Sequence, residues 1–324
     1  MVASAPMRSS DFTHQASDGK SLFVYRFLPD EPATVKAVVH LAHGMAEHAA
    51  RYARLAEALT TAGYAVYAND HRGHGKTASP EELGFFAEKD GFARVVGDLV
   101  ELVAHEKKEH PDLPLVLLGH SMGSYMVQEF IIDHGREIAG AVISGSAGKP
   151  NLLASAGRLV ARAERLRAGA RGKSKILGDL SFGAFNKQFA PTRTAFDWLS
   201  RDVAEVDKYV TDPLCGFDVT TSLWVDVLDA LGSIARPERQ ARIPKDLPIY
   251  VFSGSEDPVS EKTKSLEQLL AAYRLAGVRD VAHRFYPGAR HETLNETNRD
   301  EVTRDLITWL DAHTELRASA APPA

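Results

Sequence analysis

A serine in a short glycine-flanked segment is the strongest candidate for nucleophilic catalysis. Residues 119–123 read GHSMG, which fits the pattern G-x-S-x-G, and they follow an apolar run and precede a stretch with helical spacing. On such a strand-to-helix turn the serine hydroxyl projects above the sheet, and the flanking glycines let backbone segments approach closely. The N–H of Met122 begins the predicted helix and can stabilise developing negative charge. Ser121 is therefore the predicted nucleophile, and Met122 is the first predicted oxyanion donor.

Two later segments supply candidates for the base and the acid that a serine hydroxyl needs. Asp257 and His291 each follow an apolar run, in the segments SGSEDP and PGARHE. Both therefore fall at the carboxyl ends of predicted parallel strands, where open α/β sheets bind ligands. Asp257 is preferred to Glu256 because an Asp-Pro turn is rigid and can hold a carboxylate in place. The order Ser121, Asp257, His291 predicts a catalytic triad.

The loop after the apolar run 35–42 is expected to provide the second oxyanion donor. It begins HGMAEH. The His-Gly step lets the backbone approach a substrate, so the N–H of Met45 is the predicted donor and that of Ala46 is the alternative. Gly44, Ala46 and His120 are predicted to contact substrate. One backbone donor of this kind contributes ~3 kcal/mol, or about 10²–10³ in rate.

Short apolar runs alternate with amphipathic segments around these candidates. A strand pair is expected first, at 12–15 and 21–27. The later apolar runs are nearly continuous, which is typical of parallel strands buried on both faces. They lie at 35–42, 64–68, 115–119, 138–144, 247–254 and 282–286. The pattern predicts an α/β fold with a mostly parallel central sheet flanked by helices.

This alternation is interrupted once, and the interruption sets the expected domains. Between about 149 and 242 the chain carries helix-like segments and dense charge without a convincing buried strand. We therefore expect a core of residues 11–148 and 243–315, with a helical cap of residues 149–242 inserted into it. The two ends, 1–10 and 316–324, are expected to be disordered tails.

The composition is that of an ordinary globular protein. The 324 residues are 44% hydrophobic and 25% charged with a formal net charge of −5, so nothing favours a nucleic-acid partner. The single cysteine, Cys215, excludes an intrachain disulfide and has no partner motif. The first residues lack the apolar stretch of a secretion signal, and no window approaches the ~20 apolar residues of a membrane span. A cytoplasmic protein is expected, and its oligomeric state stays open.

Five motifs in order resemble the monoacylglycerol lipase and lysophospholipase branch of the α/β-hydrolases, the serine aminopeptidase S33-type hydrolases. They are HGMAEH with Arg51-Tyr52, DHRGHG at 70–75, GHSMG at 119–123, SGSED at 253–257 and GARHE at 288–292. The resemblance covers about residues 20–315. It implies an α/β-hydrolase fold with a helical cap, hydrolysis of carboxylic esters such as monoacylglycerols or lysophospholipids, and no metal or cofactor.

Carried over by position, the resemblance gives the same residues the same roles. Ser121, Asp257 and His291 would form the triad, and Met45 and Met122 would donate to the oxyanion. The cap resembles the family least clearly, so the resemblance says least about the substrate.

Other activities remain alternatives. An aminopeptidase would need carboxylates in the cap to hold a substrate ammonium group. The candidates are Glu164, Asp197, Asp202, Glu205 and Asp207. A carbon–carbon bond hydrolase or a cofactor-free perhydrolase would use the same serine. A non-catalytic binding protein on this fold is a remote alternative, because such a protein has no need to keep three triad residues in order.

Two patterns that suggest ligands are expected to be structural. Residues 73–78 fit a dinucleotide fingerprint, but Ser79-Pro80 continues poorly into the required helix. Asp70, Arg72 and Gly75 are therefore expected to brace a tight loop. Histidine pairs three apart, at 40/43 and 71/74, lack the H-E-x-x-H spacing of a metal-binding helix.

Two features near the predicted site keep more than one interpretation. Glu47 and His48 are expected to order the oxyanion loop, although direct contact with substrate stays open. The apolar residues of the cap either line an acyl pocket or form the core of the cap itself. Their abundance favours an apolar substrate tail, and it leaves transient contact of the cap with a membrane surface open.

Overall fold

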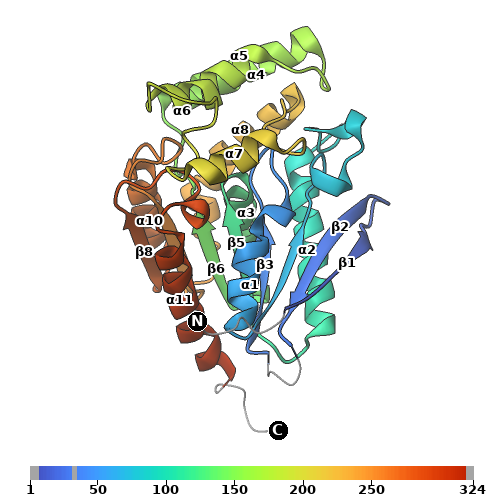
Figure 1. Cartoon of the computed structure of the whole chain (residues 1–324), viewed down its shortest axis with the longest axis vertical. Coiled ribbons are helices and arrows are strands. Elements are labelled where there is room, and N and C mark those ends of the chain that lie inside the picture. Colours follow the sequence, from blue (N-terminus) through green and yellow to red (C-terminus); the bar gives the residue numbers. More distant parts are fainter. Residues whose placement is uncertain (1–6, 31–34, 319–324) are drawn as a thin grey trace.

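The computed structural model describes residues 7–30 and 35–318 (Figure 1). The expected tails therefore lie partly outside the described residues, at 1–6 and 319–324. Residues 8–10 correct the prediction of a tail, because they begin a strand and pair with a neighbouring strand. Residues 316–318 also correct it, since they continue the last helix.

An eight-stranded sheet forms the centre of the molecule. The strands are β1 (Arg8–Gln15), β2 (Ser21–Leu28), β3 (Ala37–Ala42), β4 (Tyr64–Asn69), β5 (Leu115–His120), β6 (Gly140–Ser144), β7 (Ile249–Gly254) and β8 (Val281–Tyr286). Their order across the sheet is β1-β2-β4-β3-β5-β6-β7-β8. Strand β1 is antiparallel to β2, and β2 is antiparallel to β4. The six strands β3 to β8 run parallel to one another.

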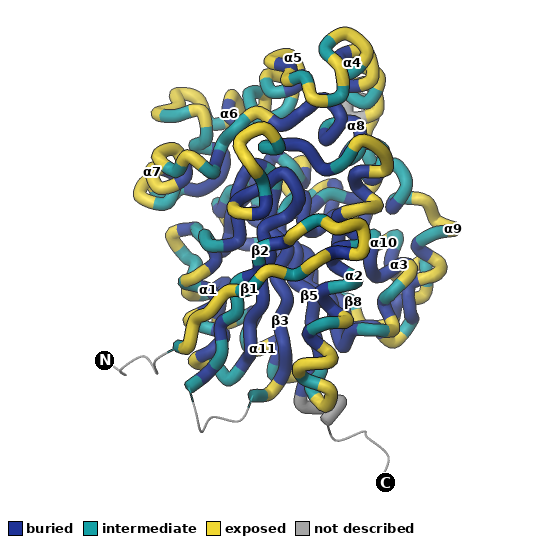
Figure 2. Tube along the Cα trace, turned by 90° about the vertical axis from the view of Figure 1, so that its right-hand side faces the viewer, coloured by how far each residue is buried: buried dark blue, intermediate teal, exposed yellow. Residues whose placement is uncertain are grey.

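The apolar runs of the sequence form the inner strands because both of their faces are covered. Every residue of β3, β4, β5, β6 and β7 is buried (Figure 2). In contrast, β1 is mostly exposed, which agrees with its place at the edge of the sheet. This arrangement confirms the predicted α/β fold.

Helices cover both faces of the sheet. The core helices are α1 (Ala53–Thr61), α2 (Gly91–Glu109), α3 (Met122–His134), α10 (Lys264–Leu275) and α11 (Arg299–Ala318). Side chains of α1 and α11 pack into one hydrophobic cluster, and those of α2, α3 and α10 pack into another. The two clusters occupy opposite faces, so the sheet is the middle of three layers. Short 3₁₀ helices connect these elements: η1 (Ala49–Tyr52), η2 (Gly75–Thr77), η3 (Pro80–Glu82), η4 (Gly135–Glu137) and η6 (Thr293–Asn295).

The segment between β6 and β7 is helical and lies above the carboxyl ends of the parallel strands (Figure 1). It contains α4 (Leu152–Ala168), α5 (Lys175–Gly178), the π-helical turn η5 (Asp179–Gly183), α6 (Ala184–Lys187), α7 (Val203–Thr211), α8 (Thr221–Ile234) and α9 (Pro237–Gln240). Helix α8 joins the two parts, because Leu223 and Val227 pack into the core cluster of α2 and α3. Among the described residues, none of the helices has both the length and the apolar character needed to cross a membrane.

Candidate active site

Ser121 lies on a strained turn between β5 and α3. Its φ is 52° and its ψ is −119°, a backbone conformation that residues other than glycine rarely adopt. The neighbouring glycines make the turn possible. A Cβ atom on Gly119 would lie 2.4 Å from the carbonyl oxygen of Gly123, and one on Gly123 would lie 2.1 Å from that of Ala42. The turn therefore holds the hydroxyl above the end of β5.

Asp257 and His291 form a buried pair at the ends of β7 and β8. His291 Nδ1 lies 3.0 Å from Asp257 Oδ1, and both side chains are buried. The Asp257 carboxylate is also held by the hydroxyl of Ser253, at 2.8 Å, and by the N–H of Val259, at 2.9 Å. A carboxylate held in this way fixes the orientation of the imidazole.

The electrostatics of this pair favour the ion pair that forms when the imidazole gains a proton. Burial acts to raise the pKa of Asp257, but the charge of His291 and three hydrogen bonds lower it below its ordinary value. Burial acts to lower the pKa of His291, but the Asp257 carboxylate raises it above its ordinary value. Asp257 therefore stays ionised, and His291 is a stronger base than an isolated imidazole.

Ser121 and His291 line the same small cavity, of about 20 Å³, together with Gly44, Met45 and His120. The ring of His291 is held between two other rings. His120 lies 4.8 Å from it and Trp198, from the segment above the sheet, lies 4.9 Å from it, measured between ring centroids. Burial lowers the pKa of His120 to about 4, so that ring is neutral beside the base.

The structure corrects one predicted substrate contact. Ala46 is fully buried and lines neither cavity that Ser121 lines. Its N–H donates to Nε2 of His74 at 3.2 Å, and its carbonyl accepts from the N–H of Gly216 and the hydroxyl of Tyr209. Because the backbone N–H and carbonyl of Ala46 are both engaged in these hydrogen bonds, Ala46 stabilises the oxyanion loop and does not contact the substrate. Met45, in contrast, lines both cavities.

A network of buried charges joins the oxyanion loop to the histidine loop. Glu47 accepts from the N–H of Gly44 at 2.6 Å and pairs with Arg51. The same Arg51 binds both oxygens of Glu292, at 2.8 and 2.7 Å. Burial acts to raise the pKa of Glu292, but Arg51 lowers it to about 2. The network thereby ties the loop of Gly44 to the residue that follows His291.

Sequence reasoning predicted part of this network only. The sequence predicts that Glu47 orders the loop and that the apolar residues of the cap, Trp198 among them, line an acyl pocket or form the core of the cap, and it assigns no role to Arg51 or Glu292. Arg51 and Glu292 are 241 positions apart, and a sequence without an alignment contains no signal that pairs them. The one signal in the sequence was the position of Arg51 and Glu292 within the motifs shared with the family, close to residues predicted to act in catalysis.

The segment that imitates a dinucleotide fingerprint is a braced loop, as predicted. Asp70 accepts from the N–H groups of Ala49 and Lys76 at 2.8 and 2.7 Å, and Arg72 binds Asp98 with two nitrogens. A Cβ atom on Gly75 would lie 2.2 Å from Oδ2 of Asp70, so the loop requires glycine there.

A second cavity, of about 260 Å³, leads from Ser121 into the helical segment above the sheet. Apolar residues dominate its wall. They include Met45, Met122, Leu177, Phe182, Phe185, Trp198, Trp224, Val227 and Leu228. Other apolar residues of the same segment pack among themselves, such as Phe196 against Tyr209. One subset of these residues therefore lines a cavity beside Ser121 and another forms a core of the helical segment, and the binding of an acyl chain in the cavity stays a prediction.

The sequence and the fold match known proteins. The family model described as "Serine aminopeptidase, S33" matches residues 33–298. The chain belongs to this family.

Curated relatives of this hydrolase family cover most of the chain. A monoacylglycerol lipase of Mycolicibacterium smegmatis is 32% identical over 86% of this chain and 89% of its own, and the human monoglyceride lipase is 28% identical over 95% and 92%. A carboxyl esterase from Bacillus coagulans, solved in complex with glycerol, has a TM-score of 0.87 and 25% identity, and covers 95% of this chain and 100% of its own. These matches confirm the predicted α/β-hydrolase fold and family. The lipase and esterase relatives also confirm the prediction of a carboxylic ester hydrolase.

Proposed function

We propose that the protein hydrolyses acyl esters through a Ser121–His291–Asp257 triad and an acyl-enzyme intermediate. The observation that carries this proposal is the buried pair of His291 and Asp257, 3.0 Å apart, beside a cavity that Ser121 lines from a strained turn. These are the three residue types that nucleophilic acyl transfer needs, and Ser121 and His291 line one cavity.

The proposed reaction has two halves. Ser121 Oγ attacks the ester carbonyl carbon while Nε2 of His291 takes the hydroxyl proton, and the N–H groups of Met45 and Met122 stabilise the oxyanion. The tetrahedral intermediate collapses as His291 passes that proton to the leaving alcohol. Water then attacks the acyl-enzyme with His291 again as the base, and the acid leaves. Asp257 keeps the proton of the resting imidazole on Nδ1 and stabilises the imidazolium.

We propose a monoacylglycerol or a similar small ester as the substrate. The wall of the 260 Å³ cavity is apolar and suits an acyl chain. The small cavity that Ser121 shares with His291 is lined in part by Glu47, His120 and Tyr209, so polar side chains lie beside the serine. Relatives named monoacylglycerol lipase and monoglyceride lipase support this choice.

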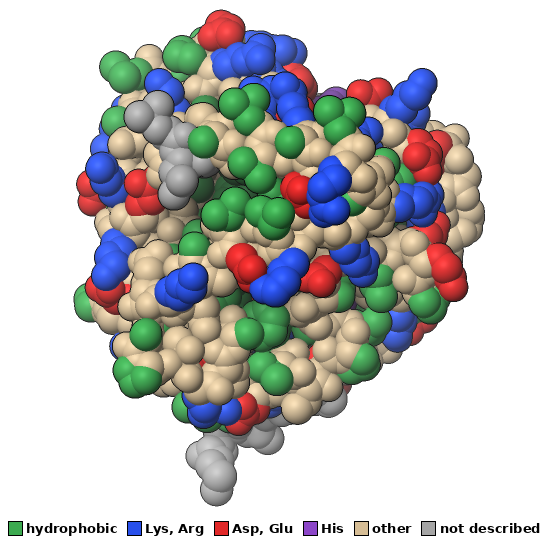
Figure 3. Space-filling view, turned by 90° about the horizontal axis from the view of Figure 1, so that it is seen from above, with side chains coloured by type: hydrophobic (Ala, Val, Ile, Leu, Met, Phe, Trp, Pro, Cys, Tyr) green, Lys and Arg blue, Asp and Glu red, His purple; other side chains and the backbone are tan. Residues whose placement is uncertain are grey.

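We further propose that residues 149–242 act as a lid that meets the surface of a lipid aggregate. Hydrophobic side chains gather around a hollow on the upper face, among Lys and Arg side chains (Figure 3). Exposed apolar residues of this segment include Leu159, Leu166, Ile176 and Leu180, with Leu166 89% exposed. Such a patch on an otherwise charged surface favours contact with lipid. Contact of this kind would be peripheral.

An aminopeptidase is less well supported, although the family description carries that word. The carboxylates that were candidates for binding an ammonium group already have partners. Glu164 pairs with Arg167, Asp202 with Arg299, and Glu205 with Lys208. Asp197 accepts from Thr194, and Asp207 pairs with Arg193. None of the five lines a cavity that Ser121 lines.

The test is hydrolysis of a panel of monoacylglycerols, simple esters of increasing acyl length and amino-acid nitroanilides. Wild-type protein should cleave the esters and leave the nitroanilides. Ser121→Ala should lower kcat by about 10⁶-fold, as loss of a triad serine does elsewhere, with the fold unchanged by circular dichroism. Ester hydrolysis near the wild-type rate in Ser121→Ala would refute the assignment, and preferential cleavage of the nitroanilides would favour the aminopeptidase.

A further inference from the structure

The helical segment above the sheet divides into two parts of opposite charge. Residues 152–187, from the start of α4 to the end of α6, contain eight Lys and Arg and two Asp and Glu. Residues 188–242 contain six Lys and Arg and nine Asp and Glu. We call residues 152–187 the outer layer, because α4 and α5 lie farthest from the sheet (Figure 1). The outer layer has a formal net charge of +6 in a chain of net charge −5, so the remaining residues carry −11.

Acidic side chains outside the outer layer neutralise only part of its charge. Three carboxylates face basic side chains of the layer, namely those of Asp229, Glu88 and Asp226. When all three are counted, an excess of three positive charges remains. Lys173, Lys175 and Lys187 are exposed, so their charges face the solvent.

Large apolar side chains are exposed on the same layer. Leu159 and Leu166 are seven positions apart in α4 and therefore lie on one face of that helix. Arg162, which is 49% exposed, lies between them on this face. Ile176 in α5 and Leu180 in η5 are exposed as well. Apolar and cationic side chains therefore share one surface that faces the solvent (Figure 3).

We propose that the outer layer binds selectively to a lipid surface that carries anionic headgroups. This inference rests on the proposed contact of the lid with a lipid aggregate, and it adds the charge of that lipid. A helix that lies on a membrane inserts its apolar side chains and keeps its Lys and Arg at the level of the headgroups. Attraction to an anionic leaflet contributes about fivefold in affinity for each Lys or Arg near the surface.

The outer layer also forms part of the wall of the apolar cavity. Leu180 is exposed, and it lines the 260 Å³ cavity that Ser121 lines. Leu177, Phe182 and Phe185 of the same layer line this cavity too. A lipid surface that contacts the outer layer would therefore lie beside the cavity proposed for the acyl chain. A substrate would then enter the cavity from the lipid.

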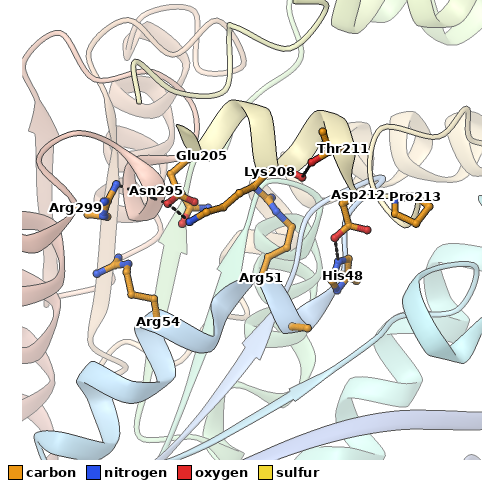
Figure 4. Close-up of a pocket in the computed structure, with 11 residues that line it drawn as sticks. His48, Arg51, Arg54, Glu205, Lys208, Thr211, Asp212, Pro213, Asn295 and Arg299 are labelled. Carbon is orange, nitrogen blue, oxygen red and sulfur yellow. Dashed lines mark hydrogen bonds and ion pairs between the residues drawn. The ribbon is translucent and has the colours of Figure 1, made fainter. Parts of the chain in front are cut away.

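A second group of basic side chains has no such excess of charge. These side chains line a surface cavity of about 750 Å³ between α1, α7 and the start of α11, and they are Arg51, Arg54, Lys208 and Arg299 (Figure 4). Each of them pairs with a carboxylate, as Lys208 does with Glu205. The carboxylates in these pairs outnumber the basic side chains, and they are Glu47, Glu205, Glu292, Asp202 and Asp300. The outer layer is therefore the surface that fits an anionic lipid.

The test is binding of the full-length Ser121→Ala protein to vesicles, because this variant separates binding from turnover. Vesicles of phosphatidylcholine with an equal part of phosphatidylglycerol should bind at least ~10-fold more tightly than vesicles of phosphatidylcholine alone. The net charge of −5 predicts the opposite order for a protein without a local basic surface. Raising the salt from about 0.1 M to about 1 M should remove most of the difference, because it shortens the Debye length from ~10 Å to ~3 Å.

Two triple variants in the Ser121→Ala background locate the surface. One replaces exposed lysines of the outer layer, by Lys173→Gln, Lys175→Gln and Lys187→Gln. Its affinity for the anionic vesicles should fall at least ~10-fold, and its affinity for the neutral vesicles should stay within about twofold. The matched control removes the same charge at exposed lysines elsewhere, by Lys107→Gln, Lys108→Gln and Lys208→Gln, and it should bind as the Ser121→Ala protein does.

Three results would overturn the proposal. The first is equal affinity of the Ser121→Ala protein for neutral and anionic vesicles, which requires no lysine variant to fold. The second is an equal loss of affinity in the two triple variants, because the attraction would then not come from the outer layer. The third is no binding to either kind of vesicle, which would also refute the proposed contact of the lid with lipid. Hydrolysis of a short soluble ester by the wild-type protein reports on the proposed triad separately.

Discussion

The parallel sheet and the helical segment above it use charge in opposite ways. Near the ends of the strands, charged side chains are buried and joined in a network, as Glu47, Arg51 and Glu292 are. In the helical segment, charged pairs such as Arg162 with Asp229 lie largely in solvent, next to exposed apolar residues such as Leu166. The difference agrees with our proposal that the ends of the strands hold the reacting groups in place and that the helical segment contacts the substrate.

The largest effect after loss of the serine is expected from the acid of the triad. Asp257→Asn keeps the size of the side chain but loses the charge that orients and stabilises His291. We expect kcat to fall by about 10⁴-fold, as in other triads of this type. Steady-state kinetics on a short ester measures it. Glu256→Gln, at a partly exposed neighbouring position, is the control and should stay within a few-fold of wild type; equal losses in the two variants would contradict the role of Asp257.

The buried network should be worth more than a surface pair of the same residue types. Arg51→Met removes a guanidinium that is buried between Glu47 and Glu292, and leaves two uncompensated carboxylates. We expect the free energy of unfolding to fall by ~3 kcal/mol or more. Arg162→Met, at a side chain that is 49% exposed, should change it by less than ~1 kcal/mol. Urea denaturation of both variants measures the change in the free energy of unfolding. Similar decreases in the two variants would contradict the difference between the two regions.

The smallest effect should come from the wall of the apolar cavity. Phe182→Ala shortens a side chain that lines the cavity of Ser121, so kcat/KM should fall by about tenfold for long acyl chains and little for acetate esters. Leu166→Ala, at an exposed position of α4, should leave kcat/KM for soluble esters unchanged. An equal loss for acetate and long-chain esters in Phe182→Ala would show that this residue acts on folding or on the triad.

The same contrast explains what could be predicted from the sequence. The strands and the turn of Ser121 depend on local patterns, namely apolar runs and glycines that tolerate close backbone contact, so their positions were predictable. The support of the oxyanion loop depends on pairs such as Ala46 with His74 and Arg51 with Glu292. These pairs form only in the folded chain. The edge strand was predicted too short because Arg8–Ser10 is polar and mostly exposed, so its pairing with β2 leaves no apolar pattern in the sequence.

The most direct test of the proposed triad is the pH dependence of fluorophosphonate labelling, followed by peptide mapping of the adduct. We predict one adduct, on Ser121, whose rate of formation falls about tenfold per pH unit below the pKa of His291, because a protonated imidazole cannot accept the serine proton. The Asp257 carboxylate raises that pKa above its ordinary value of 6.5, so the decline should begin above pH 6.5. An adduct on another residue, or a rate on Ser121 that stays constant down to pH 5, would contradict the account.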